Sequence, residues 1–531
     1  MPASRAIPSL WRPLRTPAFR NLLISAEVSD IGAFMQSVGA AWLMVSLNAG
    51  PMYVALTQTA SALPFFVFAL PAGAIGDIVD RRKLILYTET WMVGVAVVLA
   101  ALTITGSISP LPLLVLTFAL SAGDAFEAPA WRASLPELVA KEDLPAASAL
   151  NGIEFNFARA VGPGLAGLVI ITAGVGAAFL LNAVSFIGVI FVVARWKRAI
   201  PRRTTPPETV IGASVAAIRF VHYSPAIRTL LIRSGPVMFF ASGLLALMPS
   251  LTRIVRNSPT AYGLMLGCFG AGAVVGALMM QRARARWSTE AVVAAGVAIF
   301  GLATLAASAL RSLPALGAVM VVAGAAWIVF LSVLNVLVLN HAPDWVRARV
   351  LAVSTLVFQG ATAVGSATWG AVAARHGVGP ALLYAGAGTV TMTALALFLR
   401  LPDATVDLTS WNHWRLPATT GTLPTDSDRG PVLVTIEYQV AAEAAADFLK
   451  AVRQQARIRR RDGARSWGIF RDMEKADRYV ETFIVASWPE HLRQHERLTR
   501  ADRETEERVQ RYVLSEAKVR HLISVATTVT K

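Results

Sequence analysis

The feature that most constrains this chain is a pair of long apolar runs separated by a short charged stretch. Residues 54–75 contain no charged side chain, and residues 84–108 contain a single one, Glu89. Each run exceeds the roughly 20 residues that an α-helix needs to cross the ~30 Å hydrocarbon core of a bilayer. The sequence therefore predicts two membrane-spanning helices that are joined by a tight turn over residues 73–83.

The composition extends this prediction to most of the chain. Of the 531 residues, 55% are hydrophobic and 15% are charged, whereas about a quarter of the residues are charged in soluble domains. A multi-pass, all-α membrane protein is the class that fits this composition. We expect twelve spanning helices, at residues 20–46, 53–76, 84–106, 111–131, 148–171, 177–195, 229–250, 260–281, 288–310, 314–340, 349–374 and 380–400.

The distribution of basic residues predicts the orientation of these helices. Alternate connections between them contain 21 Lys and Arg residues, and the opposite connections contain 4. Because cytoplasmic connections carry the excess of positive charge, both termini are expected in the cytoplasm. The same bias accounts for the net charge of +16 without a nucleic-acid partner.

The longest connection inside the apolar region divides it into two halves, residues 1–198 and 229–400. This connection, 199–228, begins with a basic, proline-rich part and continues with apolar residues whose spacing predicts an interfacial helix over 210–221. A shift of 203 residues aligns Ala158-Arg-Ala-Val-Gly162 with Ala361-Thr-Ala-Val-Gly365. We therefore expect two related six-helix halves.

Residues 401–531 differ in composition from the rest of the chain. A stretch rich in Pro, Thr, Asp and Ser predicts a linker over 401–430. Strand and helix patterns then follow in the order β-α-β-β-α-β, over residues 432–440, 441–461, 466–471, 479–487, 490–513 and 519–525. This order predicts a small cytoplasmic α+β domain of the ferredoxin-like type over 431–531. One face of its sheet would lack a cover, so we expect pairing with a second copy of the domain.

The turn over residues 73–83 reads Gly-Ala-Ile-Gly-Asp-Ile-Val-Asp-Arg-Arg-Lys. It resembles the signature loop between the second and third helices of the major facilitator superfamily, roughly G-x-L-A-D-R-x-G-R-K. Gly73, Asp77, Arg81 and Arg82 match this pattern, whereas Asp80 stands in the place of a glycine. The resemblance implies the major facilitator fold, and it implies that these residues belong to a charged latch at the cytoplasmic side.

The fifth predicted span contains the stretch Ala158-Arg-Ala-Val-Gly-Pro-Gly-Leu-Ala-Gly167. Proline removes a helix hydrogen bond, and small residues allow a neighbouring helix to approach closely. The stretch is similar to the exporter motif of the same superfamily, G-x-x-x-G-P-x-x-G-G. The resemblance carries over to Arg159, Gly162, Pro163 and Gly167 and favours export. Ordinary packing of small residues is the alternative.

Ionisable residues inside the predicted spans concentrate in the first half. Such residues are costly in a bilayer and usually functional. They are Glu27, Asp30, Glu89, Asp124, Glu127, Glu154 and Arg159. Asp30 lies near mid-depth and is our first candidate for a proton-coupling carboxylate, with Glu27, one turn nearer the cytoplasm, as the second. A permanent pair of Asp30 with Arg159 is the alternative.

Asp124 and Glu127 lie near the predicted cytoplasmic end of the fourth span. In the superfamily an acid at this place pairs with the arginine of the signature loop. The resemblance therefore implies that Asp124 or Glu127 pairs with Arg81 and closes the cytoplasmic side.

No pattern in the sequence predicts a catalytic site, a cofactor or a bound metal. His491 and His495 are one helical turn apart, but the charged residues around them indicate a solvent-exposed helix face. The chain contains no Walker loop, so ATP hydrolysis by this chain is not expected to supply the energy. Its one cysteine, Cys268, lies in an apolar run and is expected to be inert.

As a whole, the sequence resembles one branch of the superfamily, the bacterial exporters of the enterobactin-exporter and transmembrane secretion effector type. The stretches that carry this resemblance are 71–77, 136–139, 150–151, 342–349 and 487–498. It implies a proton-coupled exporter, not an enzyme, that moves a small organic molecule such as a siderophore or a drug across the bacterial inner membrane. Two alternatives stay open: import of a small metabolite, and a monooxygenase-like enzymatic tail fused to a transporter.

Overall fold

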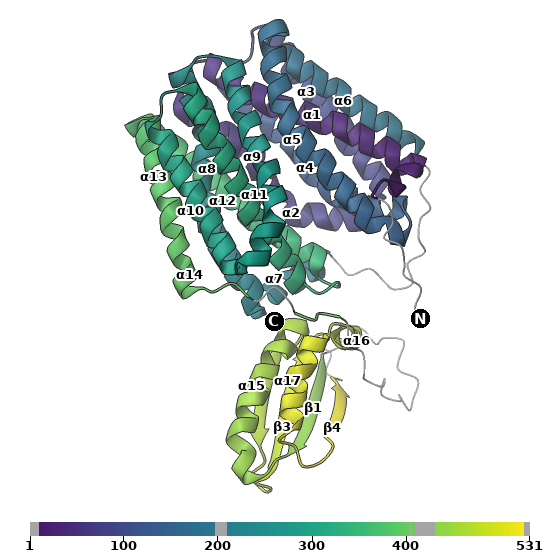
Figure 1. Ribbon diagram of the computed structural model, residues 1–531. Helices are drawn as coiled ribbons and strands as arrows, with labels where there is room; N and C mark the ends of the chain where they lie inside the picture. The colour runs from purple at the N-terminus through teal and green to yellow at the C-terminus, as the bar shows by residue number, and fades with distance from the viewer. Residues whose placement is uncertain (1–9, 197–209, 403–405, 410, 412–430, 525–531) are drawn as a thin grey trace, which may run out of the picture. The chain divides into compact units, whose positions relative to one another are not determined.

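The computed structural model describes residues 10–196, 210–402, 406–409, 411 and 431–524 (Figure 1). These residues form two compact units. The first unit consists of the described parts of Met1–Val210, Leu231–Asn335 and Ala352–Leu401. The second consists of the described parts of Ile211–Leu230, Val336–Leu351 and Pro402–Lys531.

Twelve helices among the described residues are long and apolar enough to span a membrane, which confirms the predicted number. The first half contains α1 (Pro17–Ser46), α2 (Gly50–Ile78), α3 (Arg81–Ile104), α4 (Pro110–Leu138), α5 (Leu144–Ala173) and α6 (Val175–Arg195). The second half contains α8 (Pro225–Val255), α9 (Pro259–Arg286), α10 (Thr289–Ala309), α11 (Leu313–His341), α12 (Arg347–His376) and α13 (Val378–Thr391), which α14 (Leu395–Phe398) extends. Between the halves, α7 (Val210–Tyr223) lies where the apolar spacing predicts a helix.

The helix α4 is longer than the sequence suggests. It ends at Leu138 and contains Pro129 and Pro136, whereas we expected it to end at residue 131. Prolines are tolerated in membrane helices when other groups satisfy the backbone nearby. In α4 the missing N–H groups of Pro136 and Pro129 leave the carbonyls of Arg132 and Ala125 without their usual helical donors. The extension places Asp124 and Glu127 three to four turns away from the end of α4.

Small residues bring the two halves of the bundle together. A Cβ atom on Gly263 of α9 would lie 2.5 Å from the carbonyl oxygen of Pro163 in α5, and one on Gly167 would lie 3.1 Å from the Cα of Thr260. Side chains at these positions would push the helices apart, so α5 and α9 require glycine to pack as they do.

A second set of contacts joins the halves through α1, α2, α8 and α12. A Cβ atom on Gly370 would lie 2.6 Å from that of Ala55, and Arg253 donates to the carbonyl of Val45 at 3.2 Å. Like the contacts between α5 and α9, these lie toward the end of the bundle that holds the α1–α2 and α5–α6 connections. The two halves therefore contact each other at that end, which the predicted orientation assigns to the outside.

The C-terminal part of the second unit forms the predicted α+β domain. Its elements are β1 (Val432–Gln439), α15 (Ala445–Asp462), β2 (Ser466–Arg471), β3 (Arg478–Val485), α16 (Trp488–Glu496), α17 (Arg500–Gln510) and β4 (Lys518–Ile523). The strands form one antiparallel sheet in the order β2-β3-β1-β4, which is the order expected for a ferredoxin-like fold. The single helix expected over 490–513 is wrong. Thr499 and Asp502 form a reciprocal capping box that begins a new helix, α17.

Alternation along β1 separates the two faces of this sheet. Val434 and Ile436 are buried with Phe448 of α15 and Val509 of α17, so these helices cover one face (Figure 1). Leu433, between the buried positions, belongs to the opposite face.

Candidate functional site

Five acidic residues from four helices gather in the interior of the first half. We call them the acid cluster: Asp30 of α1, Glu89 of α3, Asp124 and Glu127 of α4, and Glu154 of α5. Glu89 is 2% exposed and Glu154 is 6% exposed, whereas Asp30 and Glu127 are half-buried and Asp124 is exposed. The carboxyl groups of Asp30 and Glu154 lie within hydrogen-bonding reach of each other, as do those of Glu89 and Glu127. Glu127 also accepts a hydrogen bond from the Thr88 hydroxyl at 3.0 Å.

The contacts within the acid cluster have a chemical consequence. An ionised carboxylate only accepts hydrogen bonds, so a hydrogen bond between two carboxyl groups requires a proton on one of them. Among the described residues, no Lys or Arg forms an ion pair with a member of the cluster. The partner of Asp30 is Glu154 and not Arg159, which excludes a permanent Asp30–Arg159 pair in this structure. The cluster can therefore hold protons.

The second candidate, Glu27, lies one turn before Asp30 on α1. It is half-buried and close enough to Asp30 and Glu154 for electrostatic repulsion. The sequence did not predict that Glu89 and Glu154 contact the other acids, and it gave these two residues no role. Their helices are remote in sequence, and only the packing of α1, α3, α4 and α5 brings them together.

The basic turn between α2 and α3 has a different partner from the one expected. Arg81 donates to Glu137 Oε1 at 2.6 Å and to the carbonyl of Ala133 at 2.6 Å. The expected pairing with Asp124 or Glu127 is absent among the described residues. The reason is the extension of α4, which places Glu137 beside the turn and moves Asp124 and Glu127 into the bundle.

The other residues of this turn bind helix ends. Arg82 donates to the carbonyls of Val193 and Ala194 at the end of α6, where unpaired carbonyls and the helix dipole favour a cation. Asp80 caps α3 by accepting from the backbone N–H of Lys83 at 3.1 Å. A Cβ atom on Gly73 would meet nothing within 4 Å. The Asp77 side chain lies outside the described residues.

The motif in α5 lies where three helices meet. A Cβ atom on Gly162 would lie 2.7 Å from that of Phe34 in α1, while Pro163 and Gly167 contact α9. A Cβ atom on Gly270 of α9 would lie 3.2 Å from the carbonyl oxygen of Arg159. The geometry of the motif is thus that of close packing between α1, α5 and the second half.

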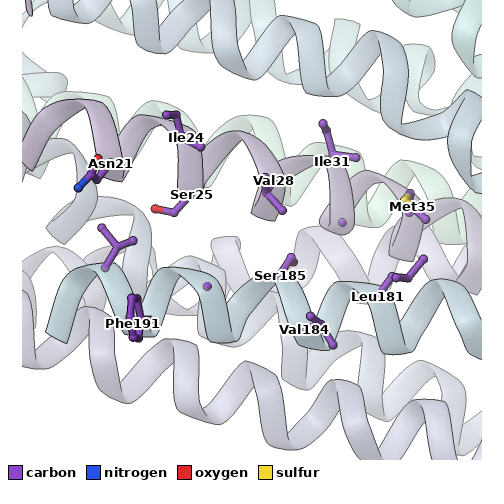
Figure 2. Close-up of a pocket in the computed structure, with 13 residues that line it drawn as sticks. Asn21, Ile24, Ser25, Val28, Ile31, Met35, Leu181, Val184, Ser185 and Phe191 are labelled. Atoms are coloured by element: carbon purple, nitrogen blue, oxygen red, sulfur yellow. The ribbon is translucent and has the colours of Figure 1, made fainter. Parts of the chain in front are cut away.

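A groove of the first unit lies between α1 and α6 (Figure 2). It measures about 590 Å³ and is lined mainly by apolar side chains such as Ile24, Val28 and Leu181. Ile24 and Val28 are one turn apart, and Asp30 lies on the opposite face of α1 because successive helical residues rotate by about 100°. An apolar groove on this face fits lipid tails or an apolar molecule.

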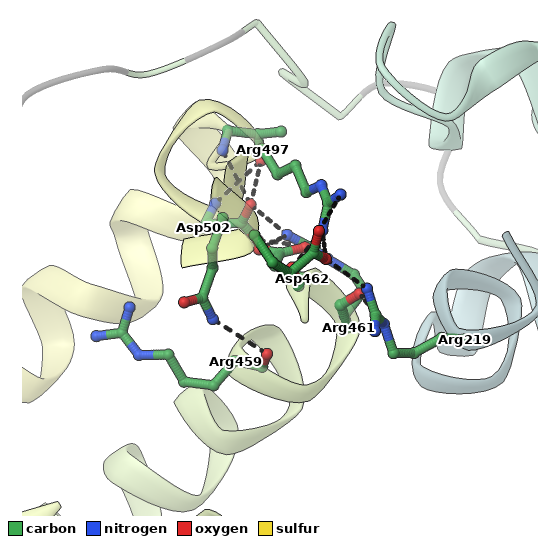
Figure 3. A network of polar contacts seen from close by, with 9 residues as sticks. Arg219, Arg459, Arg461, Asp462, Arg497 and Asp502 are labelled. Carbon is green, nitrogen blue, oxygen red and sulfur yellow. Dashed lines mark hydrogen bonds and ion pairs between the residues drawn. The ribbon is translucent and has the colours of Figure 1, made fainter. Parts of the chain in front are cut away.

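In the second unit, arginines and carboxylates form a buried network (Figure 3). Arg461 contacts Asp462 and Asp502, each at 2.7 Å. Arg497 donates to Glu490 at 2.6 Å, and Arg219 of α7 donates to the same carboxylate at 3.3 Å. Burial alone would raise the pKa of Glu490, but its arginine partners hold that pKa below the ordinary value.

Aromatic contacts extend this network within the second unit. The Arg461 guanidinium lies 5.6 Å from the ring centre of Phe220 in α7, and that of Arg497 lies 4.6 Å from the ring of Trp345. The rings of Phe220 and Trp345 contact each other edge to face at 5.7 Å. The sequence did not predict that α7 and the stretch around Trp345 pack with the C-terminal domain.

Comparison with known proteins agrees with this architecture. The family described as transmembrane secretion effector matches residues 8–529. The multidrug efflux pump Tap of Mycolicibacterium fortuitum is 26% identical over 402 residues, which is 71% of this chain and 94% of that pump. The staphyloferrin A transporter of Staphylococcus aureus is 24% identical over 158 residues, 29% of this chain and 40% of that protein.

Solved structures show the same fold. The nucleoside transporter NupG superposes with a TM-score of 0.60 at 12% identity and covers 72% of this chain and 100% of its own. A bacterial homologue of the lysosomal transporter Spinster gives a TM-score of 0.55 at 15% identity, over 73% of this chain and 95% of its own. The matching family and these proteins are transporters and not enzymes.

Proposed function

Because the chain belongs to the transmembrane secretion effector family of major facilitator transporters, we propose that it exports a small organic molecule in exchange for protons. It is a multi-pass membrane transporter of small molecules. Export rests on two supports: the similarity to an efflux pump over most of the chain, and the exporter-like motif in α5 at the junction of the two halves. Drug-like molecules and siderophores are the proposed substrate classes. The proposed location is the bacterial inner membrane, with both termini in the cytoplasm.

The acid cluster is the observation that carries the proposal of proton coupling. A proton-driven exporter needs carboxyl groups that gain protons on one side and lose them on the other. The Asp30–Glu154 contact joins α1 to α5, and the Glu89–Glu127 contact joins α3 to α4. Loss of the shared proton would turn each contact into a repulsion between two carboxylates. Deprotonation would therefore favour a different arrangement of these helices.

Arg81 and Glu137 supply the proposed control of access at the basic turn. Their pair connects the start of α3 to the end of α4 and is only partly exposed, with 21% and 15% of the two side chains accessible. In one state of the cycle this pair holds the turn in place. The predicted role of Asp77 in the same latch stays part of the proposal.

The proposal is tested in liposomes that contain the purified protein. An imposed pH gradient should drive a fluorescent drug-like dye against its concentration gradient in the wild type. Asp30→Asn should abolish this uphill movement, because an amide cannot release a proton, yet should still bind the dye. Asp447→Asn, on the exposed surface of α15, is the matched control and should transport normally. Uphill transport by Asp30→Asn at the wild-type rate would place the proton site elsewhere, and movement of the dye along with the protons would indicate import.

We also propose that the C-terminal domain pairs with a second copy through the open face of its sheet. Leu433 of β1 is paired with Ile484 of β3 and Leu522 of β4 in the register, so the three form an apolar row on that face. Leu522 is 51% exposed. Light scattering of the purified full chain should give a dimer, and Leu433→Asp should give a monomer. A monomeric wild type would refute the pairing.

A further inference from the structure

Three histidines of the C-terminal domain come together from two separate elements. α16 carries His491 and His495, and β4 carries His521. His521 is the register partner of Val434, and directly paired residues of neighbouring strands face the same side of a sheet. Because Val434 belongs to the buried core, His521 faces the covered side. The ring centres of His491 and His521 are 4.8 Å apart.

The distances suit ligands of one metal ion. The Nε2 atoms of His491 and His495 are 3.1 Å apart, and one ring nitrogen of each of the three histidines lies within 4.8 Å of the others. Two imidazole nitrogens at ~2.0–2.1 Å from a tetrahedral ion are separated by roughly 3.3 Å. His491 and His495 are therefore at ligand spacing, and a rotation of the His521 ring would complete the set.

One nitrogen of the His521 ring is available to a metal ion. Only a neutral imidazole has a lone pair for a metal ion. The Nε2 atom of His521 is buried and has no hydrogen-bond partner among the described residues. His491 is 1% exposed, so the solvent-exposed face predicted for it is wrong.

A neighbouring side chain can hold the orientation of one ring. Gln494 lies beside His491, and its amide donates to the carbonyl of Arg459 at 3.3 Å. Metal-binding histidines generally give their second ring nitrogen a hydrogen-bond partner, whereas the Nδ1 atom of His491 has none among the described residues.

We infer that His491, His495 and His521 bind one divalent transition-metal ion of the kind that prefers imidazole ligands, with Zn²⁺ as the ion to test. Three protein ligands leave a fourth position for water or another ligand. The ion would fasten α16 to β4. Glu490, the residue before His491, binds Arg219 of α7, so occupancy would also stiffen the network that includes α7.

The experiment uses the full chain purified in detergent with an affinity tag that contains no histidine. The protein is treated with a chelator, dialysed, and titrated with Zn²⁺ in a calorimeter, and the retained metal is counted by mass spectrometry. We expect one Zn²⁺ per chain, and no competition from Mg²⁺, which prefers oxygen ligands. Bound Co²⁺ should give the intense visible spectrum of a tetrahedral site.

His521→Ala should weaken Zn²⁺ binding about 100-fold or more, since even a lost neighbour of a ligand costs roughly 10- to 100-fold in affinity. His521 is half-buried at the sheet edge, so its truncation should leave the domain folded, which circular dichroism checks. His376→Ala removes an exposed histidine at the end of α12 and should bind Zn²⁺ like the wild type. Equal affinity of the wild type and His521→Ala, or no retained Zn²⁺ in the wild type, would overturn the inference.

Discussion

Buried carboxyl groups occur in both units of this protein, but their partners differ. In the first unit, the acid cluster has carboxyl groups next to carboxyl groups, without an ion pair among the described residues. In the C-terminal domain, buried carboxylates contact arginines: Asp502 contacts Arg461 at 2.7 Å, and Glu490 contacts Arg497 at 2.6 Å.

This difference separates a site that can change its charge from one that keeps it. Carboxyl groups that contact each other must share protons to be buried together, so their charge depends on access to water. The carboxylates of Asp502 and Glu490 stay ionised at neutral pH, because their arginine partners hold their pKa values below the ordinary value, whereas burial raises the pKa of Asp462 to about 6 despite its contact with Arg461. We therefore assign proton coupling to the acid cluster and a structural role to the paired carboxylates of the C-terminal domain.

The largest effect is expected in the acid cluster. Glu154→Gln should abolish uphill export as Asp30→Asn should, because in the proposed mechanism both residues share one proton. The double variant should be no worse than either single variant, since residues that act as a unit are not additive. Export rates in liposomes under an imposed pH gradient check this, with Glu443→Gln, before α15, as the control. Full activity of Glu154→Gln would separate it from the coupling site.

The basic turn should give the next largest effect on transport. Arg81→Ala should leave the protein inserted but lose most of its export, because Glu137 loses the partner that holds the turn. Arg81→Lys should recover part of the rate, since it keeps the positive charge beside Glu137 but places it on a side chain of different length and shape. Efflux from cells with matched membrane levels of each variant is the measurement. Wild-type efflux by Arg81→Ala would exclude the latch.

The acid cluster and the basic turn show which features of the structure the sequence could predict and which it could not. The length of the apolar runs and the basic connections between them predicted the twelve helices. The element order β-α-β-β-α-β predicted the ferredoxin-like sheet. The partner of Arg81 could not be predicted, because the sequence does not reveal that α4 continues through Pro136 to present Glu137. The grouping of Glu89 with Glu127, and of His521 with His491, depends on contacts between remote elements. Side-chain spacing along one helix cannot reveal such contacts.

In the C-terminal domain, breaking one buried pair should reduce stability and leave the chemistry of transport unchanged. Arg461 is 13% exposed and contacts two carboxylates. Arg461→Met would leave both without their charge partner, which typically costs about 3–5 kcal/mol. Hydrogen exchange in α15 and α17 of the full chain should accelerate, whereas Lys450→Met, whose side chain is 76% exposed, should change little. Unchanged protection in Arg461→Met would show that the network contributes little to stability.

The smallest effect is expected at Glu490, where the domain contacts α7. Because its arginine partners hold the folded-state pKa of Glu490 below the ordinary value of 4.5, this group stabilises the fold fully above pH 4.5. The contribution is lost as the pH falls through the lowered folded-state pKa. Glu490→Gln should therefore loosen α7 at pH 7. The backbone amide hydrogens of α7 should exchange a few times faster in this variant than in the wild type. The control is Glu496→Gln, which changes another residue of α16 and should leave the exchange of α7 as in the wild type. Below pH 4.5 the exchange rates of α7 in the wild type should approach those in Glu490→Gln, once both are corrected for the pH dependence of intrinsic exchange.

If α7 exchanges equally fast in the wild type and in Glu490→Gln at pH 7, the carboxylate does not hold this helix. The aromatic contacts of Arg461 and Arg497 would then be left to hold it.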